Sequence, residues 1–171
     1  MSVDQKIEFK FGYSAGETQK LEQALCRLLE CHGYKDNTIQ TQLMILRELI
    51  ISGEKLDGCK RSEADMTVHL HIENDSITVE VNKPIDESVY DRLQELDNTI
   101  QWIRGCQDPL AAGMLGPTET PDTSHIAGTN GFALARLAQK ENAIIDFYVS
   151  EDNILKLSAV RKLDADGINV V

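Results

Sequence analysis

The segment from Gln42 to Gly53 constrains the fold more than any other part of the sequence, because it is apolar almost all round a helical wheel. Apolar residues recur there at intervals of three and four and also fill the positions between them, so the expected helix is buried on several sides. The segment carries one carboxylate, Glu48. A lone glutamate in such a helix is either a functional acid or an edge residue with its head in water. The order of the surrounding elements therefore decides how Glu48 is interpreted.

The length and net charge of the chain limit its domain organisation and its possible partners. A chain of 171 residues with 42% apolar residues predicts one globular domain, which we place at residues 1–160, followed by a C-terminal tail at 161–171. The net charge of −11, without a basic cluster, argues against a nucleic-acid partner. No apolar run is long enough for a membrane span, and the first residues lack the apolar core of a signal peptide. We therefore expect a cytoplasmic protein that binds neither nucleic acid nor membrane.

Cysteines and histidines give no metal-site spacing. The four cysteines form no C-x-x-C pair, so free thiols are expected rather than zinc. His69 and His71 flank Leu70 and would share one face of a strand, where they are either a ligand pair or outward polar residues. Without a third ligand the second interpretation is favoured. No metal-binding residue is predicted.

Periodicity predicts the elements in chain order. A long segment rich in glycine and proline, residues 105–129, separates the last helix from what precedes it and is expected to be mobile or functional. The expected elements are a strand at 6–11, helices at 14–33, 37–53, 86–104 and 132–140, and two hairpins at 66–81 and 144–159. This order predicts an α/β (α+β) two-layer sandwich: a mixed, mainly antiparallel five-stranded sheet with helices on one face.

Two local motifs accompany this layout. Glu48 precedes Ser52 by four residues on the buried helix, and residues 128–137, GTNGFALARL, form a glycine-marked turn that runs into a helix. Motifs and layout together resemble the GHKL ATP-binding fold of histidine kinases, most closely the stand-alone anti-sigma-factor serine kinases of bacteria. The resemblance covers residues 1–160 in element order and size. In that family the helix carries E-x-x-x-N, so the resemblance implies Glu48 as the catalytic base and places Ser52, a poorer magnesium ligand, where the family has Asn.

The resemblance also implies a nucleotide site made from two further segments. The family has an Asp after its third strand that accepts a hydrogen bond from adenine, and here Asn82 or Lys83 stands in that place. An Asn carbonyl can accept a hydrogen bond, whereas Lys cannot. The second glycine box would place Gly128, Asn130 and Gly131 at the phosphates, at a helix N-terminus that favours anions. An ordinary junction between a loop and a helix is the alternative.

Three functions remain open at this point. The first is a bacterial regulatory module with an eroded nucleotide site, which binds ATP or ADP with Mg²⁺ weakly or not at all and holds a protein partner in a partner-switching or signalling circuit. The second is an ATP-dependent serine/threonine kinase with Glu48 as base. The third is an unrelated α+β interaction protein. The first is preferred because kinase catalysis depends on positioned metal and electrostatics, which these departures weaken. A homodimer is left open.

Overall fold

The computed structural model describes residues 4–12, 15–56, 66–105, 134 and 137–163. Strands and helices follow the predicted order. A short 3-10 turn, η1, precedes the third helix. The elements are β1 (Gln5–Phe11), α1 (Ala15–Cys31), α2 (Asp36–Leu56), β2 (Met66–Ile72), β3 (Ser76–Pro84), η1 (Glu87–Val89), α3 (Tyr90–Gly105), β4 (Ala143–Val149) and β5 (Ile154–Lys162).

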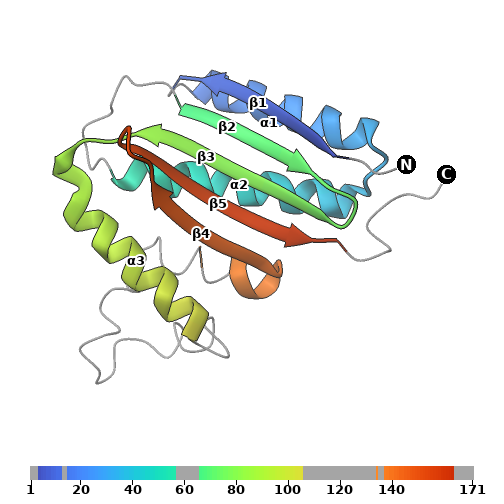
Figure 1. The fold of residues 1–171 in the computed structure, drawn as a ribbon. Coiled ribbons are helices and arrows are strands. Elements are labelled where there is room, and N and C mark those ends of the chain that lie inside the picture. Colours follow the sequence, from blue (N-terminus) through green and yellow to red (C-terminus); the bar gives the residue numbers. More distant parts are fainter. Residues whose placement is uncertain (1–3, 13–14, 57–65, 106–133, 135–136, 164–171) are drawn as a thin grey trace.

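The five strands form one sheet in the order β1-β2-β3-β5-β4 (Figure 1). All of the pairs between neighbouring strands in the described part of the chain are antiparallel. The prediction of a mixed sheet is therefore wrong for these strands. Both hairpins are antiparallel by construction, and the two helices between β1 and β2 bring the chain back in the opposite direction. The remaining pair joins one hairpin to the other and could have been parallel. It is formed by β3 and β5, which are antiparallel.

The helices lie on one face of this sheet, as predicted. α1 packs on β1, α2 packs behind β3 and β5, and α3 contacts β4 (Figure 1). Alternate residues of β2 are buried, as expected of a strand with one face in the core. The inward residues and the helix stripes form one apolar cluster. The described part of the chain is thus an α+β fold in two layers, with one face of the sheet free of helices.

Gly33 ends α1, as the sequence indicates. It has a φ of 77°, a left-handed conformation that glycine adopts without a steric penalty. The N–H of Gly33 donates to Glu30 O at 2.9 Å, and the N–H of Tyr34 donates to Leu29 O at 3.1 Å. These two bonds form a Schellman motif, which satisfies carbonyls that the end of the helix would otherwise leave unpaired.

Gly53 does not end α2, contrary to the prediction. The helix continues to Leu56, and a Cβ at Gly53 would lie 3.2 Å from Met66 Cε. The glycine therefore permits close packing against β2 rather than a stop. Two cations cap the true end of the helix: Lys83 Nζ donates to Gly53 O at 3.0 Å, and Arg92 Nη1 donates to Leu56 O at 2.8 Å. Both cations also complement the negative end of the helix dipole.

The bounds predicted for the C-terminal part of the chain agree with the structure only in part. β5 runs to Lys162, so the last strand extends past the predicted limit of the domain at residue 160. Most of the predicted loop at 105–129, part of the predicted helix at 132–140 and residues 164–171 lie outside the described residues. Leu134 and Leu137, which are described, are fully buried in the core. Among the described helices, none combines the length and the apolar content that crossing a bilayer requires.

Candidate functional site

Glu48 and Ser52 lie one turn apart on α2, the helix behind β3 and β5. Glu48 is half-buried, whereas the side chain of Ser52 is buried. The helix is less completely enclosed than its sequence indicates, because Arg47 and Ile51 are exposed. Glu48 is thus neither a core acid nor a fully solvated one. Its role as a base, and that of Ser52 as a cofactor contact, stay predictions.

Asn82 and Lys83 point to opposite faces of the sheet. They are neighbours on β3, and successive side chains of a strand alternate between faces. Lys83 reaches back to α2 on the covered face, whereas Asn82 lies opposite Lys156 and Thr67 on the uncovered one. Asn82 Oδ1 is buried without a hydrogen-bond partner. The structure therefore brings Lys83 to the Gly53 carbonyl of α2 and places Asn82 on the other face of the sheet.

Lys83 is a buried cation with a structural task. Its side chain is 1% exposed, and its ammonium donates to Gly53 O. Desolvation by burial lowers the pKa of Lys83 from 10.5 to about 8, while the nearby Glu54 opposes that shift. An ammonium in this place offers no acceptor for an adenine amine. The residue caps α2 where the resemblance would have it contact a base.

The described residues contain only part of the predicted magnesium–nucleotide site. Gly128, Asn130 and Gly131, the predicted phosphate contacts, lie outside them. Across 4–12, 15–56, 66–105, 134 and 137–163, no group of three acids, histidines or cysteines is placed to hold a metal ion. Asn82 and Lys83 face apart, and Ser52 is a hydroxyl where a strong oxygen ligand would be needed. Nucleotide binding therefore stays a prediction, and we derive no chemical step from it.

Adding about 1 mM Mg-ATP or Mg-ADP is expected to stabilise the chain by less than about 1 kcal/mol, which is the level of millimolar binding. Differential scanning fluorimetry with and without nucleotide measures this shift in melting temperature. Stabilisation by several kcal/mol would require a micromolar or tighter site. If Glu48→Gln and Asn82→Ala removed it, those two residues would be placed in the site despite their separation.

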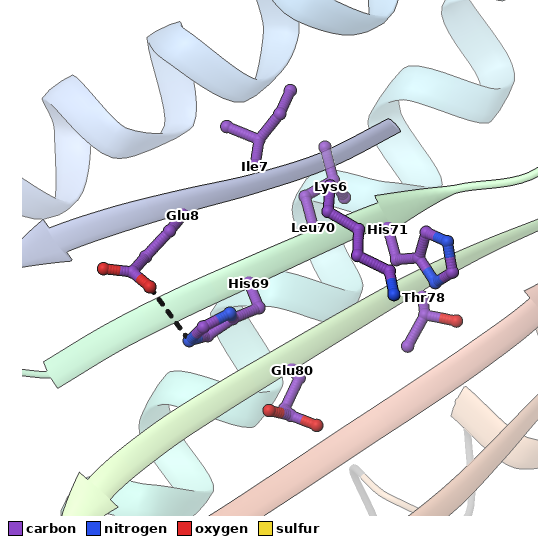
Figure 2. Close-up of a pocket in the computed structure, with 8 residues that line it drawn as sticks. All are labelled: Lys6, Ile7, Glu8, His69, Leu70, His71, Thr78 and Glu80. Carbon is purple, nitrogen blue, oxygen red and sulfur yellow. Dashed lines mark ion pairs between the residues drawn. The ribbon is translucent and has the colours of Figure 1, made fainter. Parts of the chain in front are cut away.

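The uncovered face of the sheet carries a shallow hollow of about 410 Å³ over β1, β2 and β3 (Figure 2). Ile7 and Leu70 contribute to its lining from the strands themselves. Its polar lining alternates in charge across the strands. The polar residues that line it are Lys6, Glu8, His69, His71, Thr78 and Glu80.

Strand register sets these side chains in rows. Glu8 lies opposite His69, and His69 lies opposite Glu80, so one row carries two acids around an imidazole. His69 Nε2 lies 3.7 Å from Glu8 Oε2, the pair that is dashed in Figure 2. In the neighbouring row, His71 Nε2 lies 2.8 Å from Asp4 Oδ1. Each imidazole forms an ion pair with its carboxylate when the ring is protonated.

The same face continues over β5 and β4. Lys156 lies opposite both Asn82 and Tyr148, and its ammonium sits 5.2 Å from the centre of the Tyr148 ring. Tyr148 and Ile144 are 54% and 59% exposed, so both side chains are available for contacts on this face. Together these residues make a broad surface, charged over β1 to β3 and partly apolar at β4. It suits polar and aromatic contacts with another macromolecule.

The sequence identifies only part of this surface. The alternation in residues 66–73 places His69 and His71 on the outer face, and the structure confirms that placement. Lys6, Glu8 and Glu80 were not predicted as site residues. Their alternation was visible in the sequence, but the register that places Glu8 and Glu80 on either side of His69 was not.

Neither a family model nor a curated protein matches this chain in sequence. In fold it is similar to a chain of the crystal structure of the SiaB–SiaC complex from Pseudomonas aeruginosa, with a TM-score of 0.62 and 20% identity over 90% of this chain and 88% of that one. That structure is a complex of two proteins, and neither is named as a histidine-kinase-like ATPase. The predicted membership of the GHKL family is therefore wrong on these findings. The expectation of a protein partner agrees with them.

Proposed function

We propose that this chain is a regulatory protein of a partner-switching or signalling circuit, and that it acts by binding a protein partner rather than by catalysis. The uncovered face of its sheet is the surface that it offers. The observation that carries the proposal is the continuous face from Glu8 to Tyr148, which no described helix covers. The similar fold of a chain from the SiaB–SiaC complex supports it, because that chain belongs to a protein–protein assembly.

The chemistry of this face favours a protein over other partners. Carboxylates that lie beside imidazoles alternate with Lys6 and Lys156, so the face is not uniformly basic, as a surface that binds a phosphate backbone would be. Charges of both signs in fixed rows give specificity, because a mismatched partner brings like charges together. Tyr148 adds an aromatic contact of a type that is enriched in protein interfaces.

Glu80→Arg is expected to weaken partner binding by at least about tenfold, because it places a cation beside His69 in the middle of this face. Glu95→Arg is the matched control, since it makes the same change on the exposed side of α3, in the helix layer. Quantitative affinity purification from the source cells, followed by mass spectrometry, compares the two variants with the wild-type chain. A protein lost only with Glu80→Arg is the partner, whereas equal recovery with both variants would contradict the proposed surface.

A further inference from the structure

The backbone of β1 leaves one edge of the sheet open. Along an antiparallel strand, the backbone N–H and C=O groups of successive residues point alternately toward one neighbouring strand and toward the other. The β2–β3 turn closes with the Glu73 N–H donating to Ser76 O at 2.9 Å, and this bond fixes the alternation along β2. In β2, the backbone N–H and C=O groups that point toward β3 belong to Thr67, His69 and His71. Those that point toward β1 belong to Val68, Leu70 and Ile72.

It follows that Gln5, Ile7 and Phe9 bond to β2, while the N–H and C=O groups of Lys6, Glu8 and Lys10 point away from the sheet. β1 is an edge strand in the strand order, and Figure 1 shows it at the margin of the sheet. Open edges of this kind pair readily with another strand unless something blocks them.

The opposite edge, β4, is blocked by side chains from α3 and from β4 itself. The Ser150 N–H donates to Ile154 O at 2.9 Å, so Ile145 and Phe147 are among the residues whose backbone faces outward. Arg104 Nη2 donates to Ile145 O at 3.4 Å, and the Phe147 N–H donates to Asp146 Oδ1 at 2.8 Å. The described part of the chain gives the outward groups of β1 no corresponding contacts. In the described part of the chain, side chains therefore bond to outward backbone groups of β4 but not to those of β1.

We propose that a second copy of this chain pairs with β1, antiparallel and about a twofold axis at Ile7, so that the two sheets become one. In this register Lys6 lies opposite Glu8 of the partner subunit, and Asp4 lies opposite Lys10 of the partner subunit. By symmetry, all four charged side chains on the uncovered face then meet the opposite charge. Cross-strand pairs of opposite charge stabilise a sheet, and like charges directly opposite each other destabilise it.

The neighbouring register that keeps the same hydrogen-bonding groups in place is disfavoured. It would set Glu8 against Glu8 of the partner subunit, and Lys6 against Lys10 of the partner subunit. Charge therefore favours the register centred on Ile7 over this neighbour, because only the former sets all four charged side chains opposite an unlike charge. A twofold interface of this kind uses the same patch on both copies and closes without further growth.

The covered side of the edge also has room for the partner strand. A groove of about 280 Å³ runs between β1 and α1, and Phe9, Leu21 and Ala24 form its apolar lining. Ile7 and Phe9 are only partly buried. In the proposed register Ile7 meets Ile7 of the partner subunit at the axis, and Gln5 of the partner subunit lies opposite Phe9 at the groove.

Sedimentation equilibrium of the full chain over a range of concentrations tests the association. The expected mass is about 38 kDa, twice the 19.1 kDa of the chain, and it should fall towards the monomer on dilution. Glu8→Lys sets two pairs of like charges across the axis and is expected to raise the dimer dissociation constant by about tenfold or more. The double variant Lys6→Glu/Glu8→Lys exchanges the two charges and should return it to near the wild-type value. A monomeric wild-type chain, or a double variant no tighter than Glu8→Lys, would overturn the proposal.

Disulfide formation distinguishes the register from other modes of association. Ile7→Cys, in a chain whose native cysteines are replaced by serine, places two thiols directly opposite each other at a Cα separation of about 4.5 Å. That lies within the roughly 4.4 to 6.8 Å that a disulfide spans. Mild oxidation is expected to cross-link Ile7→Cys more completely than Glu8→Cys in the same background. Equal cross-linking, or preference for Glu8→Cys, would refute the register. The dimer shares Lys6 and Glu8 with the proposed partner surface, but sedimentation and cross-linking of the purified chain report only self-association, so either proposal can fail alone.

Discussion

The difference in free energy of unfolding between the wild-type chain and Lys83→Met is expected to change by about 2 to 3 kcal/mol between pH 7 and pH 10, with the wild-type chain gaining stability. Burial lowers the pKa of Lys83 from 10.5 to about 8 in the folded chain. Between these two values the unfolded chain holds the proton more firmly than the folded chain does. Stability therefore rises with pH across this window.

Urea unfolding at several pH values, read by circular dichroism, measures this difference. Comparison with Lys83→Met removes the contributions of other titrating groups, such as Tyr34, whose pKa burial raises from 10. Methionine retains an unbranched apolar chain, but it cannot donate to Gly53 O. A difference that stays constant with pH would mean that the Lys83 ammonium reaches water, and it would contradict the burial described here.

Ile45→Ala is expected to destabilise the chain by about 2 to 5 kcal/mol, because truncating a fully buried aliphatic side chain loses its transfer free energy and leaves a cavity. Ile45 is 0% exposed and lies in the main core cluster. Ile51→Ala is the control on the same helix. Ile51 is 39% exposed, so the same truncation should cost about 1 kcal/mol or less.

Thermal and urea unfolding of both variants measure these two costs. Equal costs would show that the two faces of α2 are buried alike, as the sequence of Gln42 to Gly53 indicates when read alone. The structure instead predicts a clear asymmetry, with the Ile51 side partly in water.

The sequence was sufficient for those elements whose signals are local. Alternation in residues 66–73 and the apolar pattern of residues 144–149 predicted strands, and Gly33 predicted the end of α1, where the structure shows a left-handed conformation. The order of strands and helices, which follows from these local signals, predicted the two layers. Local patterns identify elements because period and capping depend on residues close in sequence.

Features that depend on distant residues were missed or misplaced. Gly53 was predicted to end the helix, but it permits the close approach of Met66 from β2. Lys83 of β3 donates a hydrogen bond to the Gly53 carbonyl. Asn82 and Lys83 were considered as alternative positions for one adenine contact, although strand alternation puts them on opposite faces. The all-antiparallel sheet depends on β3 meeting β5, a pairing between segments far apart in sequence. No local pattern specifies such a pairing.

Site-specific photo-cross-linking tests the proposed partner surface most directly. A benzophenone amino acid at Thr78, on the uncovered face of β3, is compared with the same amino acid at Glu95, on the exposed side of α3. Both variants are expressed in the source cells and irradiated, and the adducts are identified by mass spectrometry. The expected result is one recurrent protein adduct from position 78, absent in Glu80→Arg and absent from position 95. Adducts from position 95 with none from position 78 would contradict the assignment of partner binding to the uncovered face of the sheet.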